Sequence, residues 1–304
     1  MLPFVVSDYL IFQLTLVLST SVAVLGLNLL TGFNGQISLG HGAFFAVGAY
    51  TAAITMDRIS LPYYLAVPLA GVSCFAFGVL FGLPALRLEG LYLAIATLAL
   101  GVALPQLLRY KRIADYTGGV QGISVMKPDA PAGLPITSDQ WLYIYTLLVA
   151  IACFLVSRNI IRSHAGRAMM AIRDNATAAV AMGVNVARYK TITFGISAMF
   201  TGIAGALSSL AVQFIAPDSF SFAVSINLLV GMVVGGFGQL SGAVFGAIFN
   251  HLLPVVTEEL SKNATLAISG LIMIACINWM PYGIAGFVTQ TVLRVRAKLQ
   301  RRSA

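Results

Sequence analysis

The 48 residues from Tyr9 to Met56 read YLIFQLTLVLSTSVAVLGLNLLTGFNGQISLGHGAFFAVGAYTAAITM and contain no Asp, Glu, Lys or Arg. Roughly 20 apolar residues cross the hydrocarbon core of a bilayer as one helix, so this stretch is long enough for two crossings. The run Thr31-Gly32-Phe33-Asn34-Gly35 lies near its middle and predicts a break between the two helices. The stretch therefore predicts a pair of membrane-spanning helices.

The same pattern extends over the whole chain of 304 residues. Apolar residues make up 59% of it, charged residues only 9%, and the mean hydropathy is +0.90. A soluble domain carries about 25% charged residues, because its surface must face water. Further charge-free stretches cover Ile59–Leu86, Gly90–Leu108, Gln140–Ser157, Thr191–Pro217, Ser219–Thr257 and Asn263–Leu293.

These stretches predict an all-α fold, a polytopic transmembrane helix bundle of about nine spans. We expect one membrane-spanning domain over residues 1–304, because no linker separates a second domain. The stretch 219–257 is divided in two at Gly235-Gly236-Phe237-Gly238. The expected spans are 9–30, 36–56, 62–83, 91–108, 140–157, 191–212, 222–235, 239–257 and 264–280.

Lys and Arg in the loops predict the orientation, because cytoplasmic loops carry an excess of them. The connection 158–190 and the tail 294–304 hold most of the 18 basic residues. Four spans separate the two segments, so both are expected in the cytoplasm. This places the amino terminus outside as part of a retained first span and the carboxyl terminus inside. The cluster Arg109, Lys111 and Arg112 would then lie outside, against the rule. The net charge of +8 points to anionic lipid and not to nucleic acid.

The sequence carries none of the signatures of a soluble enzyme. It has no G-x-x-x-x-G-K-[ST] phosphate loop, no G-x-S-x-G, no H-E-x-x-H and no C-x-x-C. We therefore expect no catalytic residues, no metal and no cofactor, and any ATP that drives the protein must be bound by another subunit. Cys74, Cys153 and Cys276 fall inside expected spans and are predicted to be small packing residues.

Acidic residues are also missing from the expected spans, where ion-coupled carriers commonly place them. His41 and His251 are the remaining titratable candidates. His41 follows Ser38-Leu39-Gly40 at the start of a span. It is either a polar contact on a transport route or a packing histidine held by hydrogen bonds.

A short internal repeat is visible in the two glycine-containing breaks. Gly32-Phe33-Asn34-Gly35-Gln36-Ile37-Ser38 resembles Gly236-Phe237-Gly238-Gln239-Leu240-Ser241. Both follow a hydrophobic span and are expected on the same side of the membrane. Transporters are often built from repeats with broken helices near the substrate route, although similar glycine turns also arise by chance.

The connection 158–190 contains the most informative local pattern, the block Gly166–Gly183. Asp174 or Asn175 can cap the amino end of a short helix, and Gly183 can end it in a left-handed conformation. Mainly alanines lie between, so the helix is a thin rod between arginines. It suits insertion into a groove of a partner protein; the other interpretation is a helix resting on lipid headgroups.

At this block the sequence resembles the membrane subunits of ABC importers, specifically the high-affinity branched-chain amino-acid permeases and their urea and short-amide relatives. The resemblance covers nearly the whole chain. The matching blocks are Leu25–Leu30 with Gly35–Phe45, Gly48–Ala52, Ala94–Ala99, Gly118–Ile123, Gly166–Gly183 and Gly235–Gly238. The sequence departs from the family pattern at Val102, where a Glu is common, and at Glu89, where a basic residue is common.

The resemblance implies a transport subunit without catalysis of its own in a bacterial-type inner membrane. It would pair with a second homologous permease chain, bind two cytoplasmic ATPase subunits and receive solute from an extracytoplasmic binding protein. The resemblance assigns ATPase coupling to Gly166, Arg167, Arg173, Asp174, Asn175 and Gly183. It assigns the translocation route to Asn28, Gln36, Ser38 and His41.

We expect this protein to import branched-chain amino acids by alternating access, with the helix 174–183 as the lever. A urea or short-chain amide permease is the alternative within the family, because the binding protein sets the selectivity of such systems. A stand-alone secondary carrier or channel is the alternative outside it, and an intramembrane enzyme ranks last because no catalytic set accompanies the two histidines.

Overall fold

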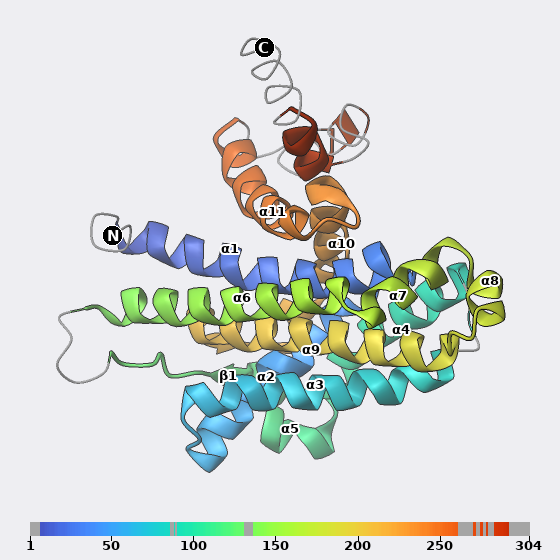
Figure 1. The fold of residues 1–304 in the computed structure, drawn as a ribbon. Helices are drawn as coiled ribbons and strands as arrows, with labels where there is room; N and C mark the ends of the chain where they lie inside the picture. Colours follow the sequence, from blue (N-terminus) through green and yellow to red (C-terminus); the bar gives the residue numbers. More distant parts are fainter. Residues whose placement is uncertain are drawn as a thin grey trace, which may run out of the picture.

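The computed structural model describes residues 7–85, 88, 90–130, 136–260, 270–271, 274–275, 278 and 283–291. It is built from helices, with one pair of two-residue strands (Figure 1). The elements in order are α1 (Asp8–Leu27) with the π-helix η2 (Asn28–Phe33), α2 (His41–Ile59), α3 (Tyr63–Ala85), α4 (Leu91–Leu108), α5 (Lys111–Thr117), η3 (Gly119–Gln121), β1 (Ile123–Ser124), α6 (Ser138–Arg162), α7 (His164–Asp174), α8 (Ala176–Ala181), α9 (Val186–Val212), β2 (Phe214–Ile215), η4 (Pro217–Phe220), α10 (Phe222–Gly236) and α11 (Leu240–Leu260).

The predicted polytopic all-α class is confirmed, whereas the number of spans is not. Six segments of the described chain are long and apolar enough to cross a membrane: Asp8–Phe33, Tyr63–Pro84, Leu91–Leu108, Ser138–Arg162, Val186–Val212 and Pro217–Gly236. The apolar part of α11, Leu240–Pro254, is shorter. Most of the expected ninth span, 264–280, lies outside the described residues, as do Arg87, Glu89, Cys276 and the tail 294–304.

The first expected break has a different structure from the predicted one. The helix does not end at Leu30 but continues as the π-turn η2 to Phe33. A loop follows, and α2 begins only at His41, after the non-helical residues 36–40. π-Turns of this kind are rare and frequently lie at functional sites.

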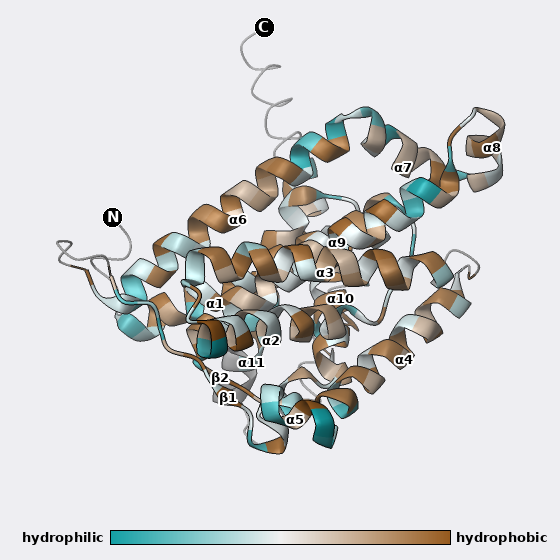
Figure 2. Cartoon of the chain, turned by 90° about the horizontal axis from the view of Figure 1, so that it is seen from below, coloured by the Kyte–Doolittle hydropathy of each residue, from teal (hydrophilic) through white to brown (hydrophobic). Residues whose placement is uncertain are grey.

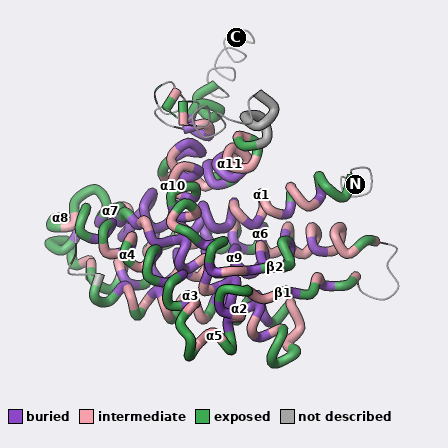
Figure 3. The backbone as a smooth tube through the Cα atoms, turned by 180° about the vertical axis from the view of Figure 1, so that it is seen from behind, coloured by how far each residue is buried: buried purple, intermediate pink, exposed green. Residues whose placement is uncertain are grey.

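Helix α9 forms the centre of the bundle. It packs against α1, α2 and α3, and most of its apolar segment is buried (Figure 3). The close approach depends on glycine: a Cβ on Gly48 would lie 2.0 Å from the carbonyl oxygen of Gly202, and one on Gly205 would lie 2.0 Å from that of Phe45. Without a hydrophobic drive between helices in lipid, such backbone proximity supplies van der Waals contact.

The two ends of the bundle differ in structure. At one end α5, the strand pair β1–β2 and η4 form a cover over α2 and α9; there Ile123 pairs with Ile215, and Arg109 forms an ion pair with Asp218. At the other end α7 and α8 project beyond the helices (Figure 1). The segment Lys111–Thr117 therefore lies away from α7 and α8.

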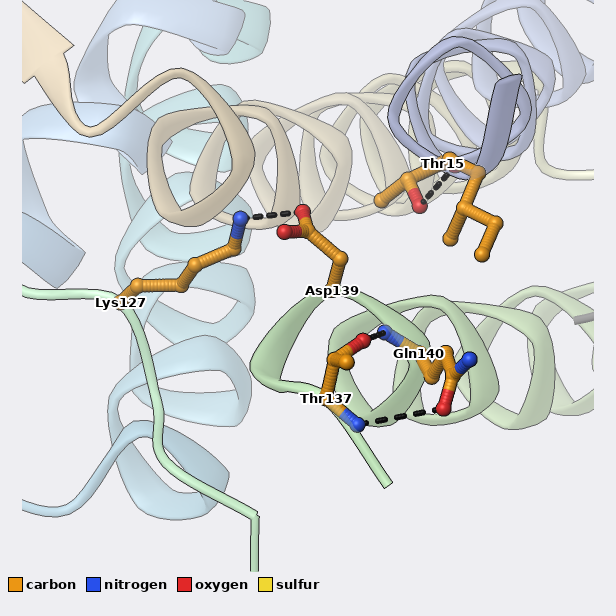
Figure 4. Close-up of polar contacts among 6 residues, drawn as sticks. Thr15, Lys127, Thr137, Asp139 and Gln140 are labelled. Carbon is orange, nitrogen blue, oxygen red and sulfur yellow. Dashed lines mark hydrogen bonds and ion pairs between the residues drawn. The ribbon is translucent and has the colours of Figure 1, made fainter. Parts of the chain in front are cut away.

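The start of α6 is fixed at the end that carries the strands. The Thr137 hydroxyl accepts a hydrogen bond from the Gln140 backbone N–H, the Gln140 side chain accepts one from the Thr137 N–H, and Lys127 pairs with Asp139 (Figure 4). This reciprocal cap satisfies two of the otherwise unpaired N–H groups. The free thiols of Cys74 and Cys153 are buried, in agreement with their predicted packing role.

Candidate functional site

Helix α7 docks onto the bundle through one face. Its Gly166, Ala168, Met169 and Ile172 are buried, whereas Arg167 and Ala171 between them are exposed. Gly166 is required at the turn from α6, since a Cβ there would lie 2.1 Å from the carbonyl oxygen of Ile161. The Ser163 hydroxyl caps α7 by accepting from the Ala165 N–H at 3.1 Å. The segment therefore has a fixed entry angle and a fixed face.

Arg173, at the end of α7, contacts the first glycine-containing segment of the repeat, Gly32–Ser38, which we call the first glycine loop. Its Nη1 donates to the carbonyl oxygen of Gly32 at 3.0 Å, and its Nε and Nη2 both donate to Oδ1 of Asp174 at 3.0 Å. The carboxylate thus fixes the orientation of the guanidinium that holds the loop. Gly35 adjoins the arginine closely, because a Cβ there would lie 2.9 Å from the Arg173 Cγ.

Asn28, in η2, joins the first glycine loop to the second segment of the repeat, Gly236–Ser241, which we call the second glycine loop. Its Nδ2 donates to the carbonyl oxygen of Gln239 at 2.7 Å, and its Oδ1 accepts from the Gly238 N–H at 2.9 Å. The Asn28 side chain is buried, and both ends of its amide are used. The two similar segments therefore touch through direct hydrogen bonds.

A small polar cavity of about 90 Å³ lies between α7 and the first glycine loop. Asn34, Gln36, Arg173 and Lys190 are among the residues that line it. Gln36 Nε2 donates to the carbonyl oxygen of Lys190 at 3.1 Å, which ties the loop to the start of α9. Both polar atoms of the buried Asn34 amide lack a hydrogen-bond partner within the described part of the chain.

Helix α8 has the caps that the sequence predicts at both ends. The Asn175 Oδ1 accepts from the Ala178 N–H at 3.0 Å. Gly183 has φ 81° and forms a Schellman closure, in which Gly183 N–H donates to Val180 O and Val184 N–H donates to Ala179 O. The two large side chains of this tip, Val180 and Met182, are 59% and 85% exposed. Helix α8 is a rigid projection with an apolar tip.

The remaining residue of the predicted coupling set, Arg167, lies elsewhere on α7. Its Nη2 contacts Nδ1 of His164 at 2.8 Å, and its Nη1 lies 3.4 Å from the carbonyl oxygen of Arg162. It therefore packs on the connection itself, and the structure does not bring it to the glycine loops as it brings Arg173.

Ser38 and His41 form a separate buried network at the start of α2. The Ser38 Oγ lies 2.9 Å from Nδ1 of His41, and the other ring nitrogen lies 2.7 Å from Oγ of Ser197 in α9. Of the four predicted route residues, Asn28 and Gln36 thus adjoin α7 and its loops, whereas Ser38 and His41 connect α2 to α9. His251 lies apart, 2.9 Å from the Thr20 hydroxyl.

The sequence does not reveal Gly32 O as the acceptor for Arg173 or the amide of Asn34 as a cavity lining. The only local signal is the glycine pattern itself, since it marks where backbone is accessible. A hydrogen bond between residues 141 positions apart has no local sequence pattern.

These features define a class: an all-helical protein with apolar helices of membrane-spanning length and a projecting helix, α8, that is joined to the bundle through α7. The chain belongs to the family described as the branched-chain amino acid transport system permease component, whose model matches residues 9–277. It is 34% identical to the high-affinity branched-chain amino acid transport system permease protein LivM of Escherichia coli K12, over 93% of this chain and 71% of that protein.

More distant relatives cover similar lengths. The probable branched-chain amino acid transport permease protein LivM of Methanocaldococcus jannaschii is 23% identical over 86% of this chain and 85% of that protein. The permease protein LivH of the E. coli high-affinity branched-chain amino acid system is 23% identical over 88% of this chain and 91% of that protein. No solved structure matches.

Proposed function

We propose that this chain is a membrane-spanning permease subunit of an ATP-driven importer of branched-chain amino acids. Family membership and the similarity to the LivM and LivH permease proteins of branched-chain amino acid transport systems support this function. The proposed assembly contains a second, homologous permease chain, two cytoplasmic ATPase subunits that bind the ATP, and an extracytoplasmic solute-binding protein. The amino terminus lies outside the cell and the carboxyl terminus in the cytoplasm.

The observation that carries the proposed mechanism is the bond between Arg173 and the Gly32 carbonyl. Movement of the ATPase subunits displaces α8, whose exposed Val180 and Met182 provide the apolar contact. Helix α7 transmits the displacement, because its buried face and Arg173 bind it to the first glycine loop. Asn28 passes it to the second loop, so that η2 and the α10–α11 turn move as one unit. Reorientation of these helices alternates access to the route.

The translocation route in this proposal adjoins Asn28, Gln36, Ser38 and His41. These polar side chains are at most 7% exposed in the single chain. Their exposure therefore accompanies the rearrangement driven by α7, and Ser38 and His41 move with α2.

The test replaces Arg173 by Gln and Asp174 by Asn in the assembled importer. Arg173→Gln removes the charged donor to Gly32 O, and hydrogen bonds to charged groups contribute about 1.5–3 kcal/mol. We expect a reduction of binding-protein-stimulated leucine uptake of about tenfold or more, with ATP hydrolysis no longer stimulated by the binding protein. Asp174→Asn is expected to give a smaller loss, since it only weakens the orientation of Arg173.

The matched control is Lys111→Gln, which removes an exposed charge at the opposite end of the bundle. It is expected to leave uptake and assembly unchanged. Normal co-purification of the ATPase subunits together with normal stimulated uptake in Arg173→Gln would refute the coupling role. Uptake by the chain alone, abolished by an uncoupler and indifferent to ATP, would instead support a secondary carrier.

The proposed orientation is tested with two exposed methionines at opposite ends, Met182 at 85% exposure and Met126 at 88%. Each is replaced by Cys and probed in intact cells with a thiol reagent that does not cross membranes. We expect Met126→Cys to react and Met182→Cys to react only after the membrane is opened. The reverse pattern would place α8 outside, where no ATPase could reach it.

The solute class is tested by purifying the assembly with its binding protein and measuring which solute is retained. We expect leucine, isoleucine and valine. Retention of urea or a short amide in their place would move the protein to the other branch of the family.

A further inference from the structure

An open apolar groove lies on the surface of the bundle, between α1, α6 and α11. Its volume is about 410 Å³, and its walls are Leu18 and Ser21 of α1, Leu240 and Val244 of α11, and a face of α6. The α6 face runs from Leu147 to Arg158. The three helices are in mutual contact, and Figure 1 shows α11 crossing α1 beside α6.

The length of the groove matches one leaflet of a bilayer. Leu147 and Arg158 are 11 positions apart on one helix, which is about 16 Å at 1.5 Å per residue. The hydrocarbon core of a bilayer is about 30 Å thick, so one leaflet accounts for roughly 15 Å. With Arg158 at the headgroup level on the α7–α8 side, a groove of this length reaches to near mid-membrane.

The groove has a single charge, at its headgroup end. Arg158 is the only charged residue among the described residues that line it. It is exposed, and no described acidic side chain forms an ion pair with it. Figure 2 shows the predominantly hydrophobic course of α6 and its hydrophilic end next to α7. Guanidinium groups bind phosphate oxygens in a two-pronged geometry, and basic pockets between membrane helices bind anionic headgroups.

We propose that this groove is a binding site for an anionic phospholipid, with an acyl chain between α1, α6 and α11 and the phosphate paired with Arg158. Charge complementarity at one end and apolar walls along one leaflet favour a lipid over a helix of another protein. A transmembrane helix would extend past Leu147 into the other leaflet, whereas the groove ends there. Because α7 begins directly after α6, a lipid at this site contacts the end of α6 from which the coupling segment starts.

The experiment measures lipid adducts on the full chain, purified with its partners, by native mass spectrometry. The probes are phosphatidylglycerol and phosphatidylcholine with identical acyl chains. We expect tighter binding of phosphatidylglycerol, a decrease in its affinity of about tenfold in Arg158→Gln, and no decrease in Arg188→Gln. Arg188 is also an exposed arginine, and it does not line the groove.

A second variant tests the apolar walls. Val244, 37% exposed, lines the groove, and Val244→Trp fills it. We expect weaker retention of both lipids. Equal phosphatidylglycerol binding by the wild-type protein and Arg158→Gln would overturn the proposal. A cross-link from Leu155→Cys to the second permease chain would also overturn it, because that chain would then occupy the groove.

Discussion

The hydroxyl of Ser197 donates to the carbonyl oxygen of Gly26 at 2.6 Å, and this bond determines the roles of the buried His41 ring. Since the only proton of Ser197 is used, its oxygen accepts from Nε2–H of His41. In the neutral ring Nδ1 then accepts from the Ser38 hydroxyl. Hydrogen bonds thus run from Ser38 to His41, from His41 to Ser197 and from Ser197 to Gly26, with each residue donating to the next. They join three helices.

Ser197→Ala is expected to destabilise the protein by about 1–3 kcal/mol, because it leaves the Nε2–H of His41 buried without an acceptor. The measurement is the thermal unfolding midpoint of the purified assembly in detergent. The control is Ser73→Ala, whose exposed hydroxyl bonds only to Leu69 O of its own helix. A normal midpoint combined with lost uptake would show that His41 serves the route and not the packing.

Among single residues, the predicted Asn175 cap and Gly183 closure are confirmed because both depend on neighbours within four positions. The bonds from Asn28 to Gly238 and Gln239 were not predicted. Asn28 belongs to a quoted sequence block, but its partners are about 210 positions away. The glycine repeat indicated the two segments and could not indicate that they touch.

At the scale of elements, Gly183 controls the shape of α8. No atom lies within 4 Å of a Cβ built on this glycine, so substitution changes only the backbone preference. Gly183→Ala is expected to disfavour the left-handed closure by about 1–2 kcal/mol. This cost reduces the population of the capped helix about five- to thirtyfold, and we expect ATPase binding to decrease by a similar factor.

The comparison variant is Gly183→Asn, since asparagine tolerates the left-handed conformation at helix ends. We expect it to retain more ATPase subunits in co-purification than Gly183→Ala, with equal thermal stability of the bundle. Identical co-purification by both variants would show that α8 does not need its closed end.

The ends of helices were also predicted where their cause lies nearby in the sequence and missed where the cause lies far away. The span 91–108 was predicted at both ends, because Gly90 and the basic residues after Leu108 mark it. The end of the first span was predicted at Leu30, whereas η2 extends it to Phe33. Within this extra turn the Gly32 carbonyl accepts a hydrogen bond from Arg173, and no local propensity encodes that distant contact.

At the scale of the whole molecule, the approach of α2 to α9 is limited by backbone. Gly48→Ala would place a Cβ 2.0 Å from the Gly202 carbonyl oxygen, and a carbonyl cannot yield as a side-chain tip does. We expect a loss of about 3 kcal/mol, at the upper end for overpacked sites. Reduced membrane yield and a lower unfolding midpoint are the measured effects.

Gly101→Ala provides the matched control in α4. It is also a buried helical glycine, but the nearest atom to its Cβ lies 3.5 Å away. Alanine is favoured over glycine in a helix by up to about 1 kcal/mol, so this change is expected to be neutral or stabilising. Equal damage from both substitutions would contradict the packing role of Gly48.

The strand pair at the far end of the bundle has a mechanical consequence. Ser124 pairs with Phe214, and Val125 N–H donates to Gln213 O at 2.8 Å, directly after α9. Helix α9 has 27 residues and is therefore about 40 Å long; residues 182–185 join its other end to α8. A displacement of the loop at residues 118–128 is thus passed through the strand hydrogen bonds to one end of a single unbroken helix, whose other end leads to α8. A change at one end of the bundle therefore reaches the other end through a few backbone hydrogen bonds and one continuous helix.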